Sequence, residues 1–216
     1  ISDKRVLVTG SPRHDDFFKQ RKKFNQNESG KTIVLVPHAP DASNGQSTIS
    51  TYEKIEDSIK RIINIVKKYP EVKLIVKLHP TQEQNNEYIK KMIQNIDPNI
   101  PLFQLELSQD VLHKCDTMIN IYTEVMPSSI LTEALILNIP VLNVVLLDKI
   151  YNFEFVKENA VLSAFNDEKL ENNIKKIVFD ENFRIQLNQN GKKYIDRYFS
   201  NQGTSSQKFA EHLDKF

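Results

Sequence analysis

The most regular feature of this sequence is an alternation between short apolar runs and longer segments in which apolar residues recur every three or four positions. Residues 51–69 are the clearest of the longer segments, and their apolar residues form one stripe along a predicted helix. That stripe consists of Ile55, Ile59, Ile62, Ile63 and Val66. Further helices are predicted at residues 15–25, 82–96, 110–115 and 128–137, and residues 167–216 are expected to be mostly helical, with breaks near residue 180 and at 201–203.

The short apolar runs are predicted to be strands. They lie at residues 5–9, 32–37, 72–78, 101–105, 117–121 and 140–145. Continuous apolar runs of this length are typical of strands that are covered on both faces, as in a parallel sheet. Because crossovers between parallel strands are right-handed, the predicted fold is α/β, with a doubly wound, Rossmann-like parallel sheet. No repeat or linker interrupts the pattern, so residues 1–216 are predicted to form a single domain.

Composition narrows the class of protein. Hydrophobic residues make up 39% of the chain and charged residues 26%, and the net charge of +1 predicts no general affinity for nucleic acid. The basic run at residues 19–23 is interpreted as a solvated helix face, with a membrane or polyanion patch as the alternative. Cys115 is the only cysteine, and no apolar run is long enough to span a membrane, so a reducing cytoplasm is expected. Because the sequence starts at Ile1 and leads almost at once into a strand, an upstream domain is expected.

Several familiar sites are excluded by their missing motifs. The five glycines form neither the G-x-G-x-x-G fingerprint of dinucleotide-binding proteins nor the G-x-x-x-x-G-K-[ST] phosphate loop. The five histidines are scattered without metal-ligand spacing, so no metal is expected. A G-x-S-x-G nucleophile elbow is also missing. Any phosphate site must therefore use a different device.

Candidate binding residues follow the strands, because ligands of such sheets bind at the carboxyl ends of the strands where the strand order reverses. Residues 127–129 (PSS) open a predicted helix, so the hydroxyls of Ser128 and Ser129 and the free N–H groups of the first turn suit a pyrophosphate. Glu133 lies about one turn further along, where it is expected to accept hydrogen bonds from a ribose. In the alternative interpretation, a serine simply caps the helix and Glu133 is a surface acid.

A histidine follows the strand predicted at residues 72–78. His79 is backed by Pro80, which fixes the loop, and is expected to hydrogen-bond a phosphate oxygen or the base. Lys77, one residue before Leu78, is expected to add positive charge to the same site. The alternative is a histidine that packs beneath the loop, but a second candidate site after another strand favours a shared crevice.

Two other strand ends carry candidate residues. Arg13 is expected to reach a second phosphate or an acceptor carboxylate as a forked donor, with an ordinary surface arginine as the alternative. Asp15 is predicted to cap the helix that follows it. His38 lies at the mouth of the strand at residues 32–37, where it is a candidate for contact with the leaving group or base. The sequence assigns no other residue a catalytic role.

These residues resemble a family pattern. Residues 10–15 (GSPRHD) resemble the G-x-P-R-x-D segment of CDP-glycerol glycerophosphotransferases and related capsule-polymer enzymes. Residues 77–80 (KLHP) resemble the K-x-H-P motif of the same enzymes, which bacterial sialyl- and Kdo-transferases share. Residues 115–116 (CD), 128–135 (SSILTEAL) and 139–141 (IPV) are similar to a stretch that is widespread in GT-B glycosyltransferases. The motifs occur in the family's order along nearly the whole chain.

The resemblance implies the C-terminal, donor-binding half of a GT-B-fold transferase. It implies that His79, Ser128 and Ser129 hold the phosphates of a CMP-, CDP- or UDP-activated sugar or polyol phosphate, and that Glu133 holds the ribose or a nearby hydroxyl. The acceptor and the catalytic base would come from an N-terminal domain or partner chain, with no metal and no cofactor besides the donor. Such enzymes synthesise surface polysaccharides or glycoconjugates in the cytoplasm or at the inner face of the membrane.

Two departures from the glycerophosphotransferase pattern leave the donor open. Residues 122–127 intervene where those enzymes place the serine pair directly after D-Y, and Glu133 is more typical of sugar-nucleotide enzymes. The non-hydrolysing UDP-N-acetylglucosamine 2-epimerases share the fold, although this chain lacks the glycines of their S-G-G-x-x-E-E motif. An epimerase-like isomerase and a non-catalytic nucleotide-binding domain are therefore the alternatives.

Overall fold

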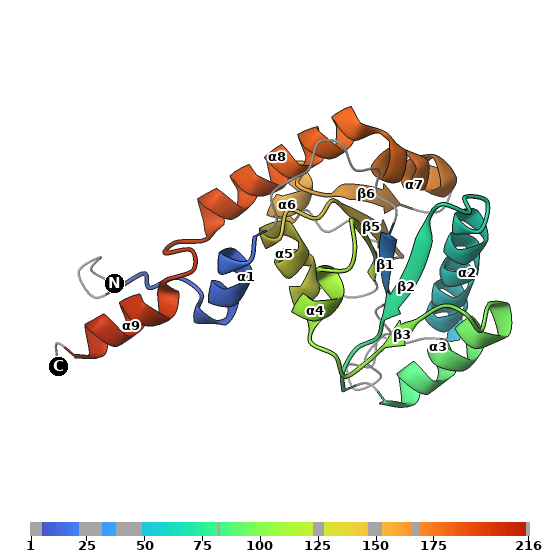
Figure 1. Ribbon diagram of the computed structural model, residues 1–216, viewed down its shortest axis with the longest axis horizontal. Coiled ribbons are helices and arrows are strands. Elements are labelled where there is room, and N and C mark those ends of the chain that lie inside the picture. The colour runs from blue at the N-terminus through green and yellow to red at the C-terminus, as the bar shows by residue number, and fades with distance from the viewer. Residues whose placement is uncertain are drawn as a thin grey trace.

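The computed structural model describes residues 6–21, 32–37, 49–81, 83–122, 128–146, 153–165 and 169–214. Its centre is a six-stranded sheet in the order β3-β2-β1-β4-β5-β6, in which each pair of neighbouring strands is parallel (Figure 1). The strands are β1 (Thr32–Pro37), β2 (Lys73–Lys77), β3 (Leu102–Phe103), β4 (Thr117–Tyr122), β5 (Val141–Val145) and β6 (Leu162–Phe165). The order reverses between β1 and β4, so the predicted doubly wound Rossmann-like sheet is confirmed.

Helices cover both faces of the sheet, as the apolar strands require. One face packs against α2 (Ile49–Val66), α3 (Glu83–Ile96) and α7 (Leu170–Phe179), and the predicted apolar stripe of α2 is buried there. The other face packs against α1 (Asp15–Lys19), α4 (Ser108–Leu112), α5 (Ser129–Ile136) and α6 (Glu154–Lys157). The long helix α8 (Glu181–Tyr198) contributes Leu187 to the first core and Ile195 to the second. Alternate residues of β1 show the same division, since Ile33 and Val34 belong to opposite cores.

The first predicted strand is wrong. Residues 6–9 form no strand, and Val6, Leu7 and Val8 are 61%, 53% and 64% exposed. The segment lies beside α9 (Ser205–Leu213). The side-chain amide of Asn201, which precedes that helix, donates to the carbonyl of Val8 at 3.3 Å. Figure 1 shows this segment and α9 projecting together from one side of the sheet. Without a neighbouring strand or a cover among the described residues, apolar character alone does not produce a strand.

The joint that holds this projection corrects a second prediction. Asp15 does not cap the helix that follows it. Its two carboxylate oxygens instead accept from the backbone N–H groups of Ser205, at 2.9 Å, and Ser206, at 2.8 Å, at the start of α9. Gly10 is also part of this joint. Its φ is 92°, which favours glycine, and a β-carbon there would lie 2.3 Å from the carbonyl oxygen of Ser200, so no other residue fits. Asp15 thus caps α9, a helix that begins 190 residues later in the same chain.

The remaining differences concern short elements. The predicted strand at 101–105 is reduced to the two residues of β3, and β6 and α6 were not predicted. A short 3-10 helix, η2 (Pro12–His14), precedes α1, and residues 22–25 of the helix predicted there lie outside the described residues. None of the helices that the structure describes is both long and apolar enough to cross a membrane.

Candidate functional site

A cavity of about 360 Å³ opens at the carboxyl ends of β1 and β2, beside the point where the strand order reverses. Its lining comes from η2, the ends of β1 and β2, the segment between β3 and α4, and the beginning of α5. All of the predicted phosphate- and sugar-binding residues line it, namely Arg13, Lys77, His79, Ser128, Ser129 and Glu133. His38, the one catalytic candidate, lies outside the described residues. The strand-end rule therefore gathered into one cavity residues that are up to 120 positions apart.

The beginning of α5 presents unused donors to the cavity. Ser128 is the N-cap residue, with φ −65° and ψ 138°, and its side chain makes no capping hydrogen bond. Ser128 thus holds the cap position of the alternative interpretation, but its hydroxyl does not cap the helix. Ser129 is exposed and also lines the cavity. The N–H groups of a first helical turn carry partial positive charge and suit an anion.

Glu133 lies one turn into α5, and its side chain is only 4% exposed. The interpretation of Glu133 as a surface acid is thus wrong. Its Oε1 accepts from Nη2 of Arg13 at 3.1 Å, and the arginine side chain is 64% exposed. The ion pair joins η2 to α5 across the cavity. It places a forked cation beside a buried carboxylate, and the exposed cation retains donors for an incoming ligand.

Lys77 lies at the opposite wall and is buried. Its Nζ donates to the carbonyl oxygens of Leu78 and Gln104, both at 2.8 Å. Burial lowers the pKa of Lys77, while the negative charges of Glu106 and Glu133 partly oppose that decrease. The sequence left the direction of this side chain open, because a strand residue can face either side of the sheet.

His79 is held by its own loop. Its Nδ1 accepts from the backbone N–H of Thr81 at 3.3 Å, and its carbonyl accepts from the side-chain amide of Asn86 at 2.6 Å. Because Nδ1 is an acceptor, the neutral ring carries its proton on Nε2, which is therefore a donor. Asn86 is buried and was not identified from the sequence, where an asparagine in a polar helix carries no distinctive signal.

The cavity also has a wall in which the sequence identified no candidate binding residue. Residues 105–108, between β3 and α4, line it together with Val36, Pro37 and Pro80. Leu105 is 80% exposed and Leu107 is 68% exposed. A largely apolar lining with a few convergent polar groups is typical of small-molecule sites. These leucines follow a strand of only two residues, so no long apolar run marked the segment as part of the site.

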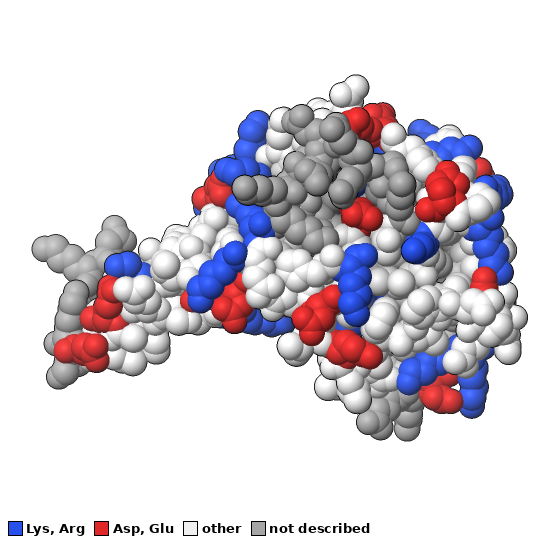
Figure 2. Space-filling model, viewed as in Figure 1, with Lys and Arg blue, Asp and Glu red and all other residues white. Residues whose placement is uncertain are grey.

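Charges near the cavity are mixed. His14, beside Arg13, is buried, and burial lowers its pKa; Glu133 raises it in part and Arg13 lowers it further. Figure 2 shows acidic and basic side chains interspersed over this view of the molecule.

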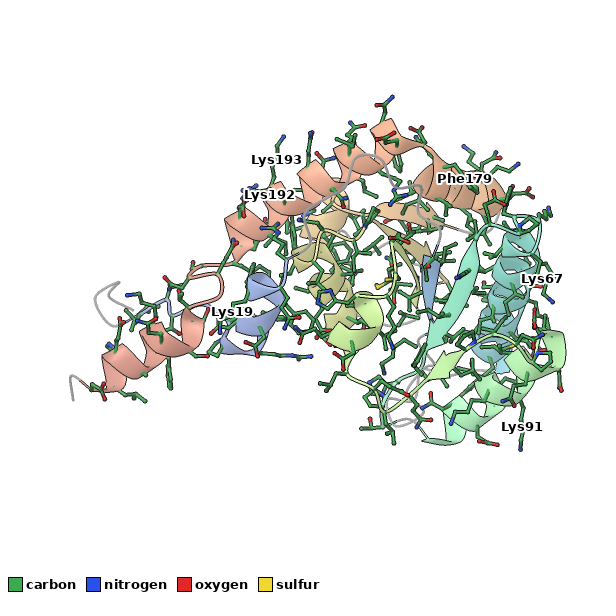
Figure 3. All side chains as sticks on the ribbon, viewed as in Figure 1. Lys19, Lys67, Lys91, Phe179, Lys192 and Lys193 are labelled. Carbon is green, nitrogen blue, oxygen red and sulfur yellow. The ribbon has the colours of Figure 1, made fainter. Side chains whose placement is uncertain are left out.

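In Figure 3, Lys19, Lys192 and Lys193 extend outward from their helices, and Lys19 pairs with Asp16 at 3.3 Å. Lys19 thus agrees with a solvated helix face, whereas Arg21 lies beyond the end of α1, has a side chain that is only 19% exposed, and donates from Nε to Oδ1 of Asn138 at 3.0 Å.

Among the residues that the structure describes, no group of three or more His, Cys, Asp or Glu side chains is arranged to hold a metal ion. Cys115 is buried, as the sequence predicted, and its Sγ contacts the carbonyl oxygen of Leu112 at 3.2 Å. What the cavity offers to a ligand is a set of hydrogen-bond donors around one buried acid, next to an apolar wall.

Comparison with known proteins shows the fold. The sequence matches no protein-family model and has no significant match among curated proteins. The UDP-N-acetylglucosamine 2-epimerase of Neisseria meningitidis, solved with UDP-N-acetylglucosamine bound, is 20% identical over 100% of this chain and 57% of its own, with a TM-score of 0.63. WaaG, a glycosyltransferase of lipopolysaccharide biosynthesis, is 15% identical over 93% of this chain and 51% of its own, with a TM-score of 0.53.

A third structure, Anabaena HepE in complex with UDP-glucose, is 15% identical over 95% of this chain and 54% of its own, with a TM-score of 0.51. The chain therefore spans about half the length of these proteins. The likenesses establish a Rossmann-like α/β fold of the GT-B kind, which both glycosyltransferases and epimerases adopt. Identities this low show the fold alone.

Proposed function

We propose that the cavity binds the nucleotide-diphosphate or monophosphate part of an activated sugar or polyol, as the donor of a glycosyl- or glycerophosphotransferase. One observation carries the proposal: Arg13, His79, Ser128, Ser129 and Glu133 meet in one cavity at the switch point of the sheet. That is the position where doubly wound sheets bind nucleotides. Solved proteins of the same fold hold UDP-N-acetylglucosamine and UDP-glucose, which supports a nucleotide-activated ligand of this class.

The donor groups divide by chemistry. The first-turn N–H groups of α5 and the hydroxyls of Ser128 and Ser129 suit the phosphates, because the Ser128 side chain makes no capping bond and the helix dipole favours an anion. Nε2 of His79 adds a donor from the end of β2, and Arg13 adds a mobile charged one. The carboxylate of Glu133 is an acceptor, which suits a hydroxyl of the ribose or sugar. With fixed donors placed at the departing phosphate, the proposed reaction requires no metal or further cofactor.

Two features support a second α/β lobe that supplies the acceptor and the catalytic base. The chain spans about half of each solved protein that it resembles. Val6, Leu7 and Val8 are exposed on the projection, as are Phe209 at 48% and Leu213 at 55% on α9. Patches of this kind are typical of interaction sites. Surface-polysaccharide synthesis at the inner face of the membrane is the setting that we propose for the whole enzyme.

The alternative with its own support is an epimerase-like isomerase. The structures of UDP-N-acetylglucosamine 2-epimerases have the same fold, with a TM-score of 0.63 for the Neisseria enzyme. A non-catalytic nucleotide-binding domain has the same cavity but no partner lobe. Incubation of the 216-residue chain with UDP-N-acetylglucosamine tests the isomerase. A transferase donor domain and a non-catalytic domain both predict a complex without turnover; formation of the epimerised UDP-sugar, or of UDP with the free epimerised sugar, would establish the isomerase.

Calorimetric titration with UDP, CDP and CMP tests the donor site. We expect binding of at least one nucleotide, and we expect His79→Ala to weaken it by about 1–3 kcal/mol through the lost hydrogen bond. His113→Ala is the matched control, because His113 lies at the end of α4, where its Nε2 meets Oε1 of Gln20 at 2.9 Å, and it does not line the cavity. Failure of all three nucleotides to bind at millimolar concentration would refute the proposal.

A further inference from the structure

Lys77 is the buried cation of the cavity, and its ammonium is turned toward backbone carbonyls. The residue is 4% exposed, and its Nζ lies 2.8 Å from the carbonyl oxygens of both Leu78 and Gln104. Leu78 ends the β2 region, whereas Gln104 is the first residue after β3. The ammonium therefore bridges the ends of two neighbouring strands. Two of its three N–H groups are used in that bridge.

The segment on the far side of the bridge leads from Gln104 into the apolar wall at residues 105–108. It leaves the sheet after a strand of two residues, where the backbone N–H of Leu78 donates to the carbonyl of Phe103 at 2.7 Å. The backbone N–H of Gln104 then donates to Oε2 of Glu106 at 2.8 Å. Leu105 and Leu107 are largely exposed. A segment with so little burial depends on hydrogen bonds for its position, and the bond from Lys77 anchors its first residue.

A lysine is a costly choice for a buried position. Removing an ammonium from water carries a free-energy cost that an apolar side chain of similar length would not incur. Here two carbonyl oxygens solvate the charge, and the carboxylates of Glu106 and Glu133 favour the charged form. The contacts indicate a task that needs directed donors. The exposed cation of the site, Arg13, has a different geometry, since its side chain extends into solvent beside Glu133.

We infer that Lys77 is a positioning residue, which through Gln104 fastens the wall at residues 105–108 to the end of β2 and so fixes the width of the donor cavity. This assignment differs from the phosphate contact expected for Lys77 from the sequence. Its structural part stands without any ligand. Its effect on binding rests on the proposed nucleotide site, where a loosened wall gives the ligand a less complementary cavity.

Hydrogen exchange of the unliganded chain tests the structural part. Lys77→Met keeps the length of the side chain and removes every donor, so we expect two bonded amides at this joint, those of Gln104 (to Glu106) and Leu78 (to Phe103), to exchange about tenfold faster or more, the effect of a lost hydrogen bond to a charged group. Lys77→Gln keeps an N–H donor without the charge and is expected to restore most of the protection. Lys73→Met, at the exposed start of the same strand, is the control, and the amides of β1 report whether the sheet itself is intact.

Titration with UDP separates positioning from charge. If Lys77 acts through the wall, Lys77→Gln retains most of the wild-type affinity and Lys77→Met loses about tenfold. If Lys77 contacts the phosphates through its charge, the two variants lose affinity equally, and wall exchange stays at the wild-type rate in both; this result would overturn the inference.

Should the wild-type chain bind no UDP, the proposed function fails, but hydrogen exchange still decides the role of Lys77. Should Lys77→Met not fold, Lys77→Gln decides: wild-type exchange at Gln104 together with most of the wild-type affinity for UDP supports the inference, and wild-type exchange together with a clear loss of affinity contradicts it.

Discussion

Replacement of Arg13 by alanine is expected to lower the affinity for UDP by about ten- to a hundredfold, because hydrogen bonds to charged groups contribute about 1.5–3 kcal/mol. Two effects act in the same direction. The donor itself is lost, and the carboxylate of Glu133, whose side chain is 4% exposed, then faces the incoming phosphates without its partner at 3.1 Å. Like charges repel, particularly in a cavity with an apolar wall.

The fold of the Arg13→Ala variant should be almost unaffected. The arginine side chain is 64% exposed, and ion pairs with such solvent access contribute little to stability. Isothermal titration and thermal unfolding of the same sample therefore separate binding from folding. Arg13→Lys keeps the charge and loses the fork, so its affinity should lie between those of wild type and alanine.

Arg61→Ala is the matched control for Arg13→Ala. Arg61 lies on α2, away from the cavity, where it pairs with Asp57 at 3.8 Å. Its removal should leave the affinity for UDP unchanged. Wild-type affinity in Arg13→Ala, with clear nucleotide binding in the parent chain, would show that the Arg13–Glu133 pair is a structural bridge with no part in binding.

The sheet could be predicted from the sequence because its strands carry their own signal. The runs at 32–37 and 117–121 are largely apolar, and in the structure they become the neighbouring strands on either side of the switch point. The run at 5–9 has the same apolar pattern but no strand partner among the described residues. β6, with Ser163 and Ala164 at its centre, has too weak an apolar signal to be recognised. Local pattern therefore predicts strand propensity, and the presence of a neighbour decides whether a strand forms.

The candidate site could be predicted as a set of positions but not as a set of contacts. The rule that ligands bind at strand ends selected His79, Ser128 and Glu133, and the structure brings them to one cavity. The partner of Glu133 was beyond prediction, since Arg13 is 120 residues away and its alternative as a surface arginine was equally consistent with the sequence. The direction of Lys77 had the same difficulty, because it depends on where the segment after β3 runs. Contacts between distant segments are a property of the packed chain and leave no local pattern.

Asp15 provides the second large expected effect, because one side chain holds the start of α9. In Asp15→Asn, one of two acceptors and the negative charge are lost, and we expect the free energy needed to open α9, measured by hydrogen exchange at residues 205–213, to fall by about 1–3 kcal/mol.

Burial alone would raise the pKa of Asp15, but hydrogen bonds from Ser206 and Ser205 outweigh burial and hold the pKa below its ordinary value of 3.8. Because the folded-state pKa is depressed, the carboxylate stabilises the joint fully above pH 3.8, and this contribution is lost as the pH falls through the folded-state pKa. The difference in urea midpoint between wild type and Asp15→Asn should therefore be present at pH 7 and shrink below pH 3.8. Asp16→Asn, an exposed neighbour that pairs with Lys19, should show neither the stability loss nor the pH dependence; equal behaviour of the two variants would mean that the cap on α9 does not hold the projection in place.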